Sequence, residues 1–330
     1  MGVLSGARVL VTGADGFIGS HLVERLVAEG ANVRAFCLYT SEGSVGWLSD
    51  LPPTDRARLD IRLGDVRDRR LVEDAVDGVD VVFHLAALIA IPYSYRAGQS
   101  FVETNVMGTL NVLEALRDAP RLLVHTSTSE VYGTPETLPI TERHPLNAQS
   151  PYAASKLAAD QLVLAYHRSF GIPAVVLRPF NTYGPRQSQR AVLPTMLAQL
   201  LAGRREIRLG RLDTSRDLTF VADTVDGFVR AATTPAAIGE TIQLGTGRAE
   251  TIGRLFEIAR DIVGTHAEAV ADPERMRPDA SEVLALRSDP TRAAEVLGWR
   301  ATTSLEDGIR ATVDWLRGRP LPDEVERVRV

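Results

Sequence analysis

The stretch that decides the fold is residues 8–19, RVLVTGADGFIG. It begins with a short apolar run typical of a buried strand, followed at three-residue spacing by Gly13, Gly16 and Gly19. Glycines between a strand and a helix permit a tight turn, close approach of a phosphate to the backbone, and close packing of the helix on the strand. The free N–H groups at the start of that helix attract a pyrophosphate. The stretch therefore predicts the strand, loop and helix that open a dinucleotide-binding fold.

The same alternation of short strands and longer helices continues to about residue 180. Apolar, β-branched runs predict strands at 8–12, 32–37, 59–63, 79–84, 121–126 and 174–177. Apolar residues at three- and four-residue spacing predict helices at 16–29, 67–76, 102–116 and 152–170. This order predicts an α/β fold, a doubly wound parallel (Rossmann) sheet with helices on both faces, and it places ligands at the carboxyl ends of the strands.

Beyond residue 180 the alternation loosens, which predicts a smaller C-terminal lobe. We assign residues 1–180 to the dinucleotide-binding domain, with returning segments around 216–250, and residues 181–330 mainly to a substrate-binding lobe. The lobe pattern indicates a strand at 206–209, helices at 223–233, 251–263, 290–297 and 304–316, and a frayed charged end at 319–330.

Composition narrows the classes of partner. The chain has 330 residues, of which 45% are apolar and 24% charged, and this balance indicates a globular protein. The net charge of -5 gives no basic field for nucleic acid. Cys37 is the only cysteine, so neither an internal disulfide nor a Cys/His metal site is expected. The N-terminus has no apolar signal core, and we therefore expect a cytoplasmic protein without a membrane segment.

Residues 152–156, YAASK, contain the only lysine of the chain, Lys156. On a helix this spacing places the Tyr152 phenol and the Lys156 ammonium one turn apart on one face. A neighbouring ammonium and an oxidised nicotinamide both favour the phenolate, which would make Tyr152 a base. The alternative is an ordinary surface pair. Because an ammonium on a slim stem can reach both ribose hydroxyls, the pair indicates a catalytic role.

A run of hydroxyl residues, Thr126 to Glu130, ends the fifth predicted strand. Thr128 is placed where a substrate alcohol would meet Tyr152, whereas Thr126 and Ser127 could equally be a polar strand end. Glu130 is the informative residue, because a carboxylate beside a nicotinamide site is costly unless it is paired or takes part in the chemistry.

Two loops bear on the choice of cofactor. Asp65 follows the third strand and could accept a hydrogen bond from an adenine amino group, although a turn-capping role is the alternative. The second strand ends in Cys37 and then Leu38–Thr40, with neither an acid to bind the ribose nor an arginine for a 2′-phosphate. We therefore expect NAD and leave NADP open.

The motifs TGADGFIGSHL, GDVRD, FHLAA, TSTSEVYG, YAASK, RPFNTYGP and SRDLTFVAD occur in this order. Together they resemble the extended short-chain dehydrogenase/reductase family that acts on nucleotide-activated sugars. The resemblance extends to about residue 317. Within it, Glu130 resembles the 4,6-dehydratase and uronate decarboxylase branches, and Ser129 stands where dTDP-glucose 4,6-dehydratases have aspartate. VRAFCLYTSEGSVGWLSDL and RPFNTYGPRQSQRAVLPT look most like the nucleotide-activated N-acetylglucosamine 4,6-dehydratases of legionaminic acid pathways.

This resemblance implies a set of site residues. The catalytic residues would be Thr128, Ser129, Glu130, Tyr152 and Lys156. The residues in contact with the cofactor would be Gly13, Asp15, Gly16, Phe17, Ile18, Gly19, Asp65, Val66, Leu85, Ala86, Ala87, Asn105, Thr126, Tyr152, Lys156 and Pro179. The residues in contact with the sugar or its phosphates would be Ser94, Thr128, Asn181, Arg216 and Arg277. Asp223 is expected to be a helix cap and not a catalyst.

The favoured function is a nucleotide-sugar 4,6-dehydratase acting on UDP- or GDP-N-acetylglucosamine. A 4-epimerase or a uronate decarboxylase on the same scaffold is the alternative chemistry, and a non-catalytic nucleotide sensor is the alternative of another class. We also expect a homodimer packed through the helices at 102–116 and 152–170, because both carry apolar residues beyond one stripe. Those residues are Val112, Leu113, Leu157, Leu162, Val163 and Leu164.

Overall fold

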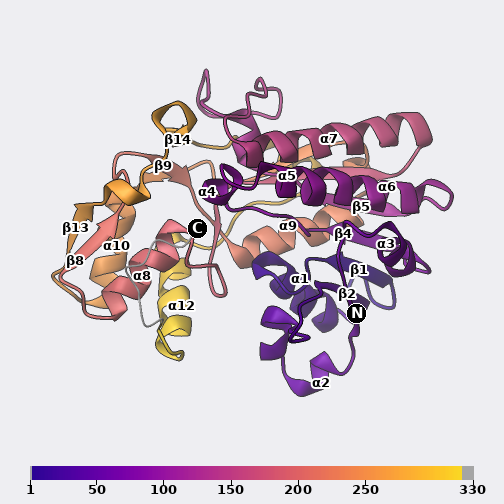
Figure 1. The fold of residues 1–330 in the computed structure, drawn as a ribbon, viewed down its shortest axis with the longest axis horizontal. Coiled ribbons are helices and arrows are strands. Elements are labelled where there is room, and N and C mark those ends of the chain that lie inside the picture. The colour runs from indigo at the N-terminus through magenta and orange to yellow at the C-terminus, as the bar shows by residue number, and fades with distance from the viewer. Residues whose placement is uncertain (1, 322–330) are drawn as a thin grey trace.

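The computed structural model describes residues 2–321. A seven-stranded, entirely parallel sheet lies at the centre of its larger part (Figure 1). Part of the frayed end predicted for 319–330 lies outside the described residues. The strand order is β11-β6-β5-β4-β1-β2-β3. The strand bounds are β1 (Arg8–Thr12), β2 (Asn32–Leu38), β3 (Asp60–Gly64), β4 (Val81–His84), β5 (Leu122–Thr126), β6 (Ala174–Pro179) and β11 (Thr241–Leu244). Because β1 lies between β2 and β4, the chain winds outward in both directions from β1, which confirms the predicted doubly wound fold.

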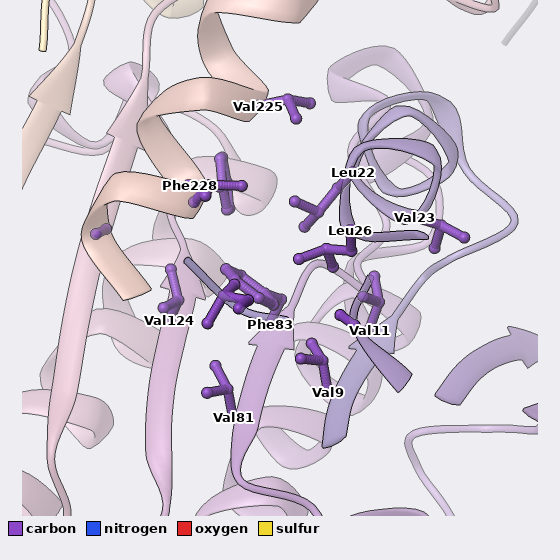
Figure 2. Close-up of a cluster of buried hydrophobic side chains, with 14 of the residues drawn as sticks. Val9, Val11, Leu22, Val23, Leu26, Val81, Phe83, Val124, Val225 and Phe228 are labelled. Atoms are coloured by element: carbon purple, nitrogen blue, oxygen red, sulfur yellow. The ribbon is translucent and has the colours of Figure 1, made fainter. Parts of the chain in front are cut away.

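Strand β1 shows how the sequence fixes the two layers. Its side chains alternate, so that Val9 and Val11 enter the core on one face and Leu10 enters the core on the other. On the first face they pack with Leu22 and Phe228, from helices α1 (Phe17–Ala28) and α9 (Val221–Thr233) (Figure 2). The strand is apolar throughout because both of its faces are covered.

The opposite face is covered by α3 (Arg69–Val76), α6 (Gly108–Arg117) and α7 (Pro151–Phe170). Helix α7 begins where the Ser150 hydroxyl accepts a hydrogen bond from the Ala153 N–H, and it ends at Gly171 in a left-handed conformation. These signals position the catalytic candidates on α7, since they fix the start of the helix at Pro151, one residue before Tyr152.

The helix predicted at 102–116 begins one turn earlier and is not uniform. It runs through α5 (Gly98–Phe101), a π-helical segment η2 (Val102–Met107) and α6. The wider turn is a tertiary feature that the spacing of apolar residues does not encode, and it carries Asn105.

The second lobe lies beside the sheet, at the left in Figure 1. Its elements are β7 (Thr182–Tyr183), α8 (Val192–Leu201), β8 (Glu206–Leu209), β9 (Ser215–Asp217), β10 (Thr219–Phe220), β12 (Ala249–Thr251), α10 (Ile252–Val263), β13 (Glu268–Ala271), β14 (Ala285–Leu286) and α12 (Leu305–Arg317). Its core is a separate apolar cluster that includes Tyr183, Leu197, Phe256 and Ile309. Within residues 2–321, no helix is both long and apolar enough to cross a bilayer.

Two segments after residue 180 return to the sheet. Both lie within the segments around 216–250 that the sequence assigned to the dinucleotide-binding domain: helix α9 packs on the sheet beside α1, and β11 adds a seventh strand next to β6. The remaining short elements are η1 (Gly46–Asp50), α2 (Pro53–Arg56), α4 (Ile91–Ser94), η3 (Ser129–Tyr132), η4 (Pro235–Ala237), η5 (Pro273–Arg275), η6 (Asp279–Ser281) and α11 (Thr291–Leu297).

Candidate active site

The carboxyl ends of five sheet strands bring the predicted site residues to one edge of the sheet. The glycine loop follows β1, Asp65 follows β3, and Leu85 follows β4. Thr128 follows β5, and Pro179 is the last residue of β6. Ligands of open parallel sheets bind at this edge, on either side of the point where the chain changes winding direction.

The glycine loop is shaped for a phosphate. Gly13 has a φ of +68°, and a Cβ there would lie 2.8 Å from the Ala86 backbone nitrogen. A Cβ on Gly19 would lie 2.0 Å from the Gly13 carbonyl oxygen. Gly16 precedes α1 without any side-chain cap, so the first N–H groups of Phe17 and Ile18 lack a capping side chain. Close backbone packing and an uncapped helix start fit the diphosphate of a dinucleotide.

Asp15 lies within this loop, and its surroundings are unusual for a carboxylate. Burial raises its pKa, although hydrogen bonds from its own N–H and from the Leu38 backbone oppose that change. The carboxylate thus faces the end of β2, where an acid that binds ribose would ordinarily stand. The η1 segment covers the loop, because the Trp47 N–H donates to the Asp15 carbonyl at 3.1 Å.

A buried pair of polar side chains orders the loop after β4. The Thr12 hydroxyl lies 2.8 Å from His84 Nδ1 and accepts hydrogen bonds from the Leu85 and Ala86 N–H groups, both at 3.2 Å. His84 Nε2 in turn lies 3.1 Å from the Thr109 hydroxyl. Residues 85–87 are therefore held by the ends of two neighbouring strands, beside the glycine loop.

Asn105 extends this support. Its amide oxygen accepts a hydrogen bond from the Leu88 N–H at 2.8 Å. Its amide nitrogen donates to the Leu88 carbonyl and to the Ser155 hydroxyl, both at 2.9 Å. Asn105, which the sequence places among the cofactor contacts, uses these hydrogen bonds to tie the loop after β4 to α7.

Thr128, Tyr152 and Lys156 are brought together and are nearly buried, with exposed fractions of 8%, 8% and 3%. The Tyr152 phenol is hydrogen-bonded to the Thr128 hydroxyl. Phe101 packs edge-on against the Tyr152 ring, with the ring centroids 6.3 Å apart. The phenol is therefore fixed, nearly buried, beside the end of β5.

Burial dominates the acid–base character of this trio. It raises the pKa of Tyr152 to about 12, with the Thr128 hydrogen bond opposing it and the charges of Glu130 and Asp160 adding to it. Burial also lowers the pKa of Lys156 to about 8, against the attraction of Asp160. Of the two groups expected to favour the phenolate, the Lys156 ammonium does not by itself outweigh the cost of burying the phenolate charge.

Glu130 lies at the junction of the sheet and the lobe, and its side chain is 12% exposed. One of its oxygens lies 3.9 Å from Nη1 of Arg277, a nitrogen that is buried without a hydrogen bond in the described residues. Arg216, nine-tenths buried, pairs with Glu282 at 3.2 Å. Burial lowers the pKa of Arg216, against the attraction of Glu130 and Glu282. Two arginines and two carboxylates thus line the lobe side of the site.

The other predicted site residues differ in whether their polar groups already have a partner in the chain. Thr126 and Asn181 each present a buried oxygen without a hydrogen bond from any described residue, as a ligand contact would require. The Ser94 hydroxyl donates to the Ile91 carbonyl at 2.7 Å, inside its own turn. Asp65 pairs with Arg67, which lowers the pKa of Asp65. Val66, which follows Asp65, and Ser129, which follows Thr128, are buried.

Two groups near the site were not predicted from the sequence. One is a buried set of charges around Asp160, which lies four residues after Lys156, a spacing that could have drawn attention to it. The other is Ser281, whose hydroxyl lies 2.6 Å from the Tyr95 phenol oxygen and donates to the Gln149 carbonyl at 2.8 Å. Because these contacts join segments more than 130 residues apart, no local pattern indicated them. Within the described residues, no group of three or more metal-ligating side chains occurs.

Comparison with known proteins identifies relatives over nearly the whole chain. The family model described as GDP-mannose 4,6 dehydratase matches residues 10–312. A UDP-glucose 4-epimerase of Mycolicibacterium smegmatis is 36% identical over 319 residues, covering 94% of this chain and 99% of that protein. A dTDP-glucose 4,6-dehydratase of Actinoplanes sp. is 35% identical, covering 94% and 98%. Among solved structures, TunA, an NAD-dependent NDP-hexosamine 5,6-dehydratase involved in tunicamycin biosynthesis, superposes with a TM-score of 0.83 at 30% identity, covering 96% and 99%.

Proposed function

From the premise that the chain belongs to the extended short-chain dehydrogenase/reductase family of NAD-dependent nucleotide-sugar dehydratases and epimerases, we propose that it is a 4,6-dehydratase. The observation that carries this choice is the position of Glu130. It stands two residues after Thr128 and close enough to raise the pKa of Tyr152 by its charge. An epimerase needs only the removal and return of hydrogen at carbon 4, and a carboxylate beside its base would raise the cost of the phenolate.

Tyr152 begins the reaction as a general base. With the Thr128 hydroxyl as hydrogen-bonded neighbour, its phenolate takes the proton of the sugar 4-hydroxyl, and carbon 4 becomes a ketone. The ketone makes the proton on carbon 5 acidic, because the resulting negative charge spreads onto the ketone oxygen.

Glu130 carries out the step that separates a dehydratase from an epimerase. Its carboxylate takes the proton from carbon 5 and passes a proton to the departing 6-hydroxyl, which leaves as water. One carboxylate can serve both atoms because they lie on adjacent carbons. A hydride would then be returned to carbon 6 and a proton to carbon 5. Tyr152 gives up the one proton that it took from the 4-hydroxyl and carbon 5 regains one, so the product is a 4-keto-6-deoxy sugar and the protein ends with the protons it began with.

The cofactor would be held by the glycine loop, by residues 85–87, and by Lys156 at the nicotinamide ribose. When bound, the nicotinamide supplies a hydride acceptor for carbon 4 and returns the hydride to carbon 6. Its positive charge would also favour the Tyr152 phenolate, which burial alone disfavours. NAD is the cofactor we propose, because no arginine follows β2 to receive a 2′-phosphate.

The substrate we propose is UDP- or GDP-N-acetylglucosamine. Arg216 and Arg277 would clamp the diphosphate, and their guanidinium groups suit its oxygens. The hexosamine named for TunA supports an amino sugar, as does the resemblance to dehydratases of legionaminic acid pathways. Asn181, with its unpaired buried oxygen, would accept a hydrogen bond from the sugar.

A 4-epimerase is the second candidate, since the M. smegmatis relative at 36% identity has that name. A panel of UDP-GlcNAc, GDP-GlcNAc, GDP-mannose and dTDP-glucose separates the two functions. Incubation with the protein and mass spectrometry should show loss of one water from an amino sugar nucleotide. Conversion to a 4-epimer of unchanged mass would instead support the epimerase.

A further inference from the structure

A fully buried carboxylate lies behind the catalytic pair. Asp160 follows Lys156 by one turn of α7, with no exposed surface. Its Oδ2 accepts hydrogen bonds from the Ser127 hydroxyl at 2.7 Å and from Nη2 of Arg178 at 3.0 Å. Its Oδ1 lies 3.4 Å from Nε2 of His125. A buried carboxylate is costly, so this one requires a reason beyond packing.

The partners of Asp160 come from two strands beneath α7. Ser127 and His125 belong to the end of β5, and Arg178 belongs to β6. Arg178 also donates to the Tyr132 phenol oxygen at 2.9 Å, an oxygen that accepts a second hydrogen bond from Gln243 at 2.7 Å. These contacts hold the carboxylate of Asp160 in a single place.

The titratable groups around Lys156 do not all carry a charge that acts on it. His84 and His125 are buried, and burial together with the Lys156 charge lowers the pKa of each, which favours their neutral forms. Burial opposes the charge of Asp160, but its contacts with His125, Arg178 and Ser127 keep its pKa below the ordinary value. Among the described residues, Asp160 is thus the negative charge that acts on Lys156.

We propose that Asp160 is a positioning residue of the reaction, whose carboxylate, held by Ser127 and Arg178, keeps the buried Lys156 in its charged ammonium form. The proposal rests on the proposed function, since it assigns Lys156 and Tyr152 their catalytic roles. Asp160 cannot favour the Tyr152 phenolate directly, because its own negative charge raises the pKa of that phenol. Its contribution must therefore pass through Lys156.

The sequence offers a direct way to observe this effect. Lys156 is the only lysine of the chain, so protein grown with isotope-labelled lysine gives one side-chain signal in a nuclear magnetic resonance spectrum. The chemical shift of that signal over a pH series reports the proton affinity of Lys156 without substrate or assay. For the natural chain we expect a midpoint near pH 8, where burial places the pKa of Lys156.

Three variants then separate an electrostatic role from a structural one. In Asp160→Asn the midpoint should fall by about one pH unit or more, the effect of losing a nearby opposite charge. In Arg178→Gln a neighbouring positive charge is removed while the Ser127 hydroxyl still holds Asp160, so the midpoint should rise. Glu114→Gln removes a carboxylate that faces α7 through Tyr166, away from Lys156, and should leave the midpoint unchanged.

The test is decisive because the titration midpoint is expected to move in opposite directions in Asp160→Asn and Arg178→Gln. An unchanged midpoint in Asp160→Asn, or a fall in both Asp160→Asn and Arg178→Gln, would overturn the proposal, because general disruption of the site moves both variants together. If Asp160→Asn does not fold, Arg178→Gln decides alone: a rise there supports the account, and a fall or an unchanged midpoint contradicts it. The titration needs no substrate, so its outcome is independent of whether the dehydratase assignment holds. With an active substrate, the alkaline limb of the rate of cofactor reduction should move to lower pH in Asp160→Asn by the same amount.

Discussion

At the scale of single residues, removal of the Tyr152 phenol should reduce turnover the most. Tyr152→Phe keeps the ring that packs on Phe101 and deletes only the phenol oxygen. We expect turnover to fall by several orders of magnitude, because no other group is placed to take the proton from the 4-hydroxyl, while cofactor affinity stays close to that of the natural chain. Stopped-flow cofactor reduction and fluorescence titration measure the two quantities. Near-normal turnover would remove Tyr152 from its proposed role.

Some properties of single residues could be predicted from the sequence, and others could not. The spacing of Tyr152 and Lys156 could be predicted because helix geometry alone brings the two together. The pKa of Tyr152 could not, because it depends on how completely the phenol is buried. The same limit applies to Asp223: its carboxylate accepts hydrogen bonds from the Thr302 N–H at 3.2 Å and the Thr303 N–H at 3.0 Å, ahead of α12 and not at the start of its own helix.

At the scale of elements, the junction of β1 and α1 should be intolerant of a single methyl group. In Gly19→Ala the new Cβ would meet the Gly13 carbonyl oxygen at 2.0 Å, so the helix must move away from the phosphate loop. We expect cofactor affinity to fall at least about tenfold, or about 1.4 kcal/mol. Gly98→Ala is the matched control, because nothing lies within 4 Å of its Cβ. Equal affinities in the two variants, measured by calorimetry, would contradict the proposed phosphate site.

The π-helical turn that carries Asn105 supports a second element-scale prediction. Asn105→Ala leaves the partly buried N–H and carbonyl of Leu88 without this partner and removes a buried hydrogen bond to the Ser155 hydroxyl, and we expect a loss of about 1–3 kcal/mol in the free energy of unfolding. Asn111→Ala removes one partly buried hydrogen bond to the Val66 carbonyl and one exposed hydrogen bond to the Arg67 carbonyl, and it should cost less than about 1 kcal/mol. Urea denaturation compares the two. Lost cofactor affinity with unchanged stability in Asn105→Ala would instead indicate a direct cofactor contact.

Elements also differ in how far the sequence could predict them. Strands β1, β2 and β5 fall within two residues of their predicted bounds because each is a short apolar run covered on both faces. Strand β11 was missed, because its four residues TIQL include two polar side chains and follow the loosened pattern after residue 180. Its place in the sheet is fixed by pairing with β6, a contact between distant segments.

At the scale of the whole molecule, we propose a homodimer, with a revised interface. Val112, Leu113 and Val163 are fully buried in the chain's own core and leave nothing for a partner. The exposed apolar residues of the two neighbouring helical segments are instead Val102, Met107 and Phe170. Light scattering at micromolar concentration should give a dimer, and Met107→Lys should weaken it, whereas Met276→Lys on another surface should not. A monomeric natural chain would contradict the proposal.

The measurement that tests the central claim most directly is the reaction of Glu130→Gln, followed by absorbance of the reduced cofactor and by mass spectrometry. Tyr152 is untouched in this variant, so reduced cofactor should accumulate on the protein. Loss of water should nearly stop, and so should exchange of the carbon 5 proton with deuterated solvent, because an amide cannot accept that proton. Glu257→Gln, which changes an exposed carboxylate paired with Arg254, should behave as the natural chain. Normal loss of water in Glu130→Gln, or inversion at carbon 4 without loss of water by the natural chain, would contradict the dehydratase account.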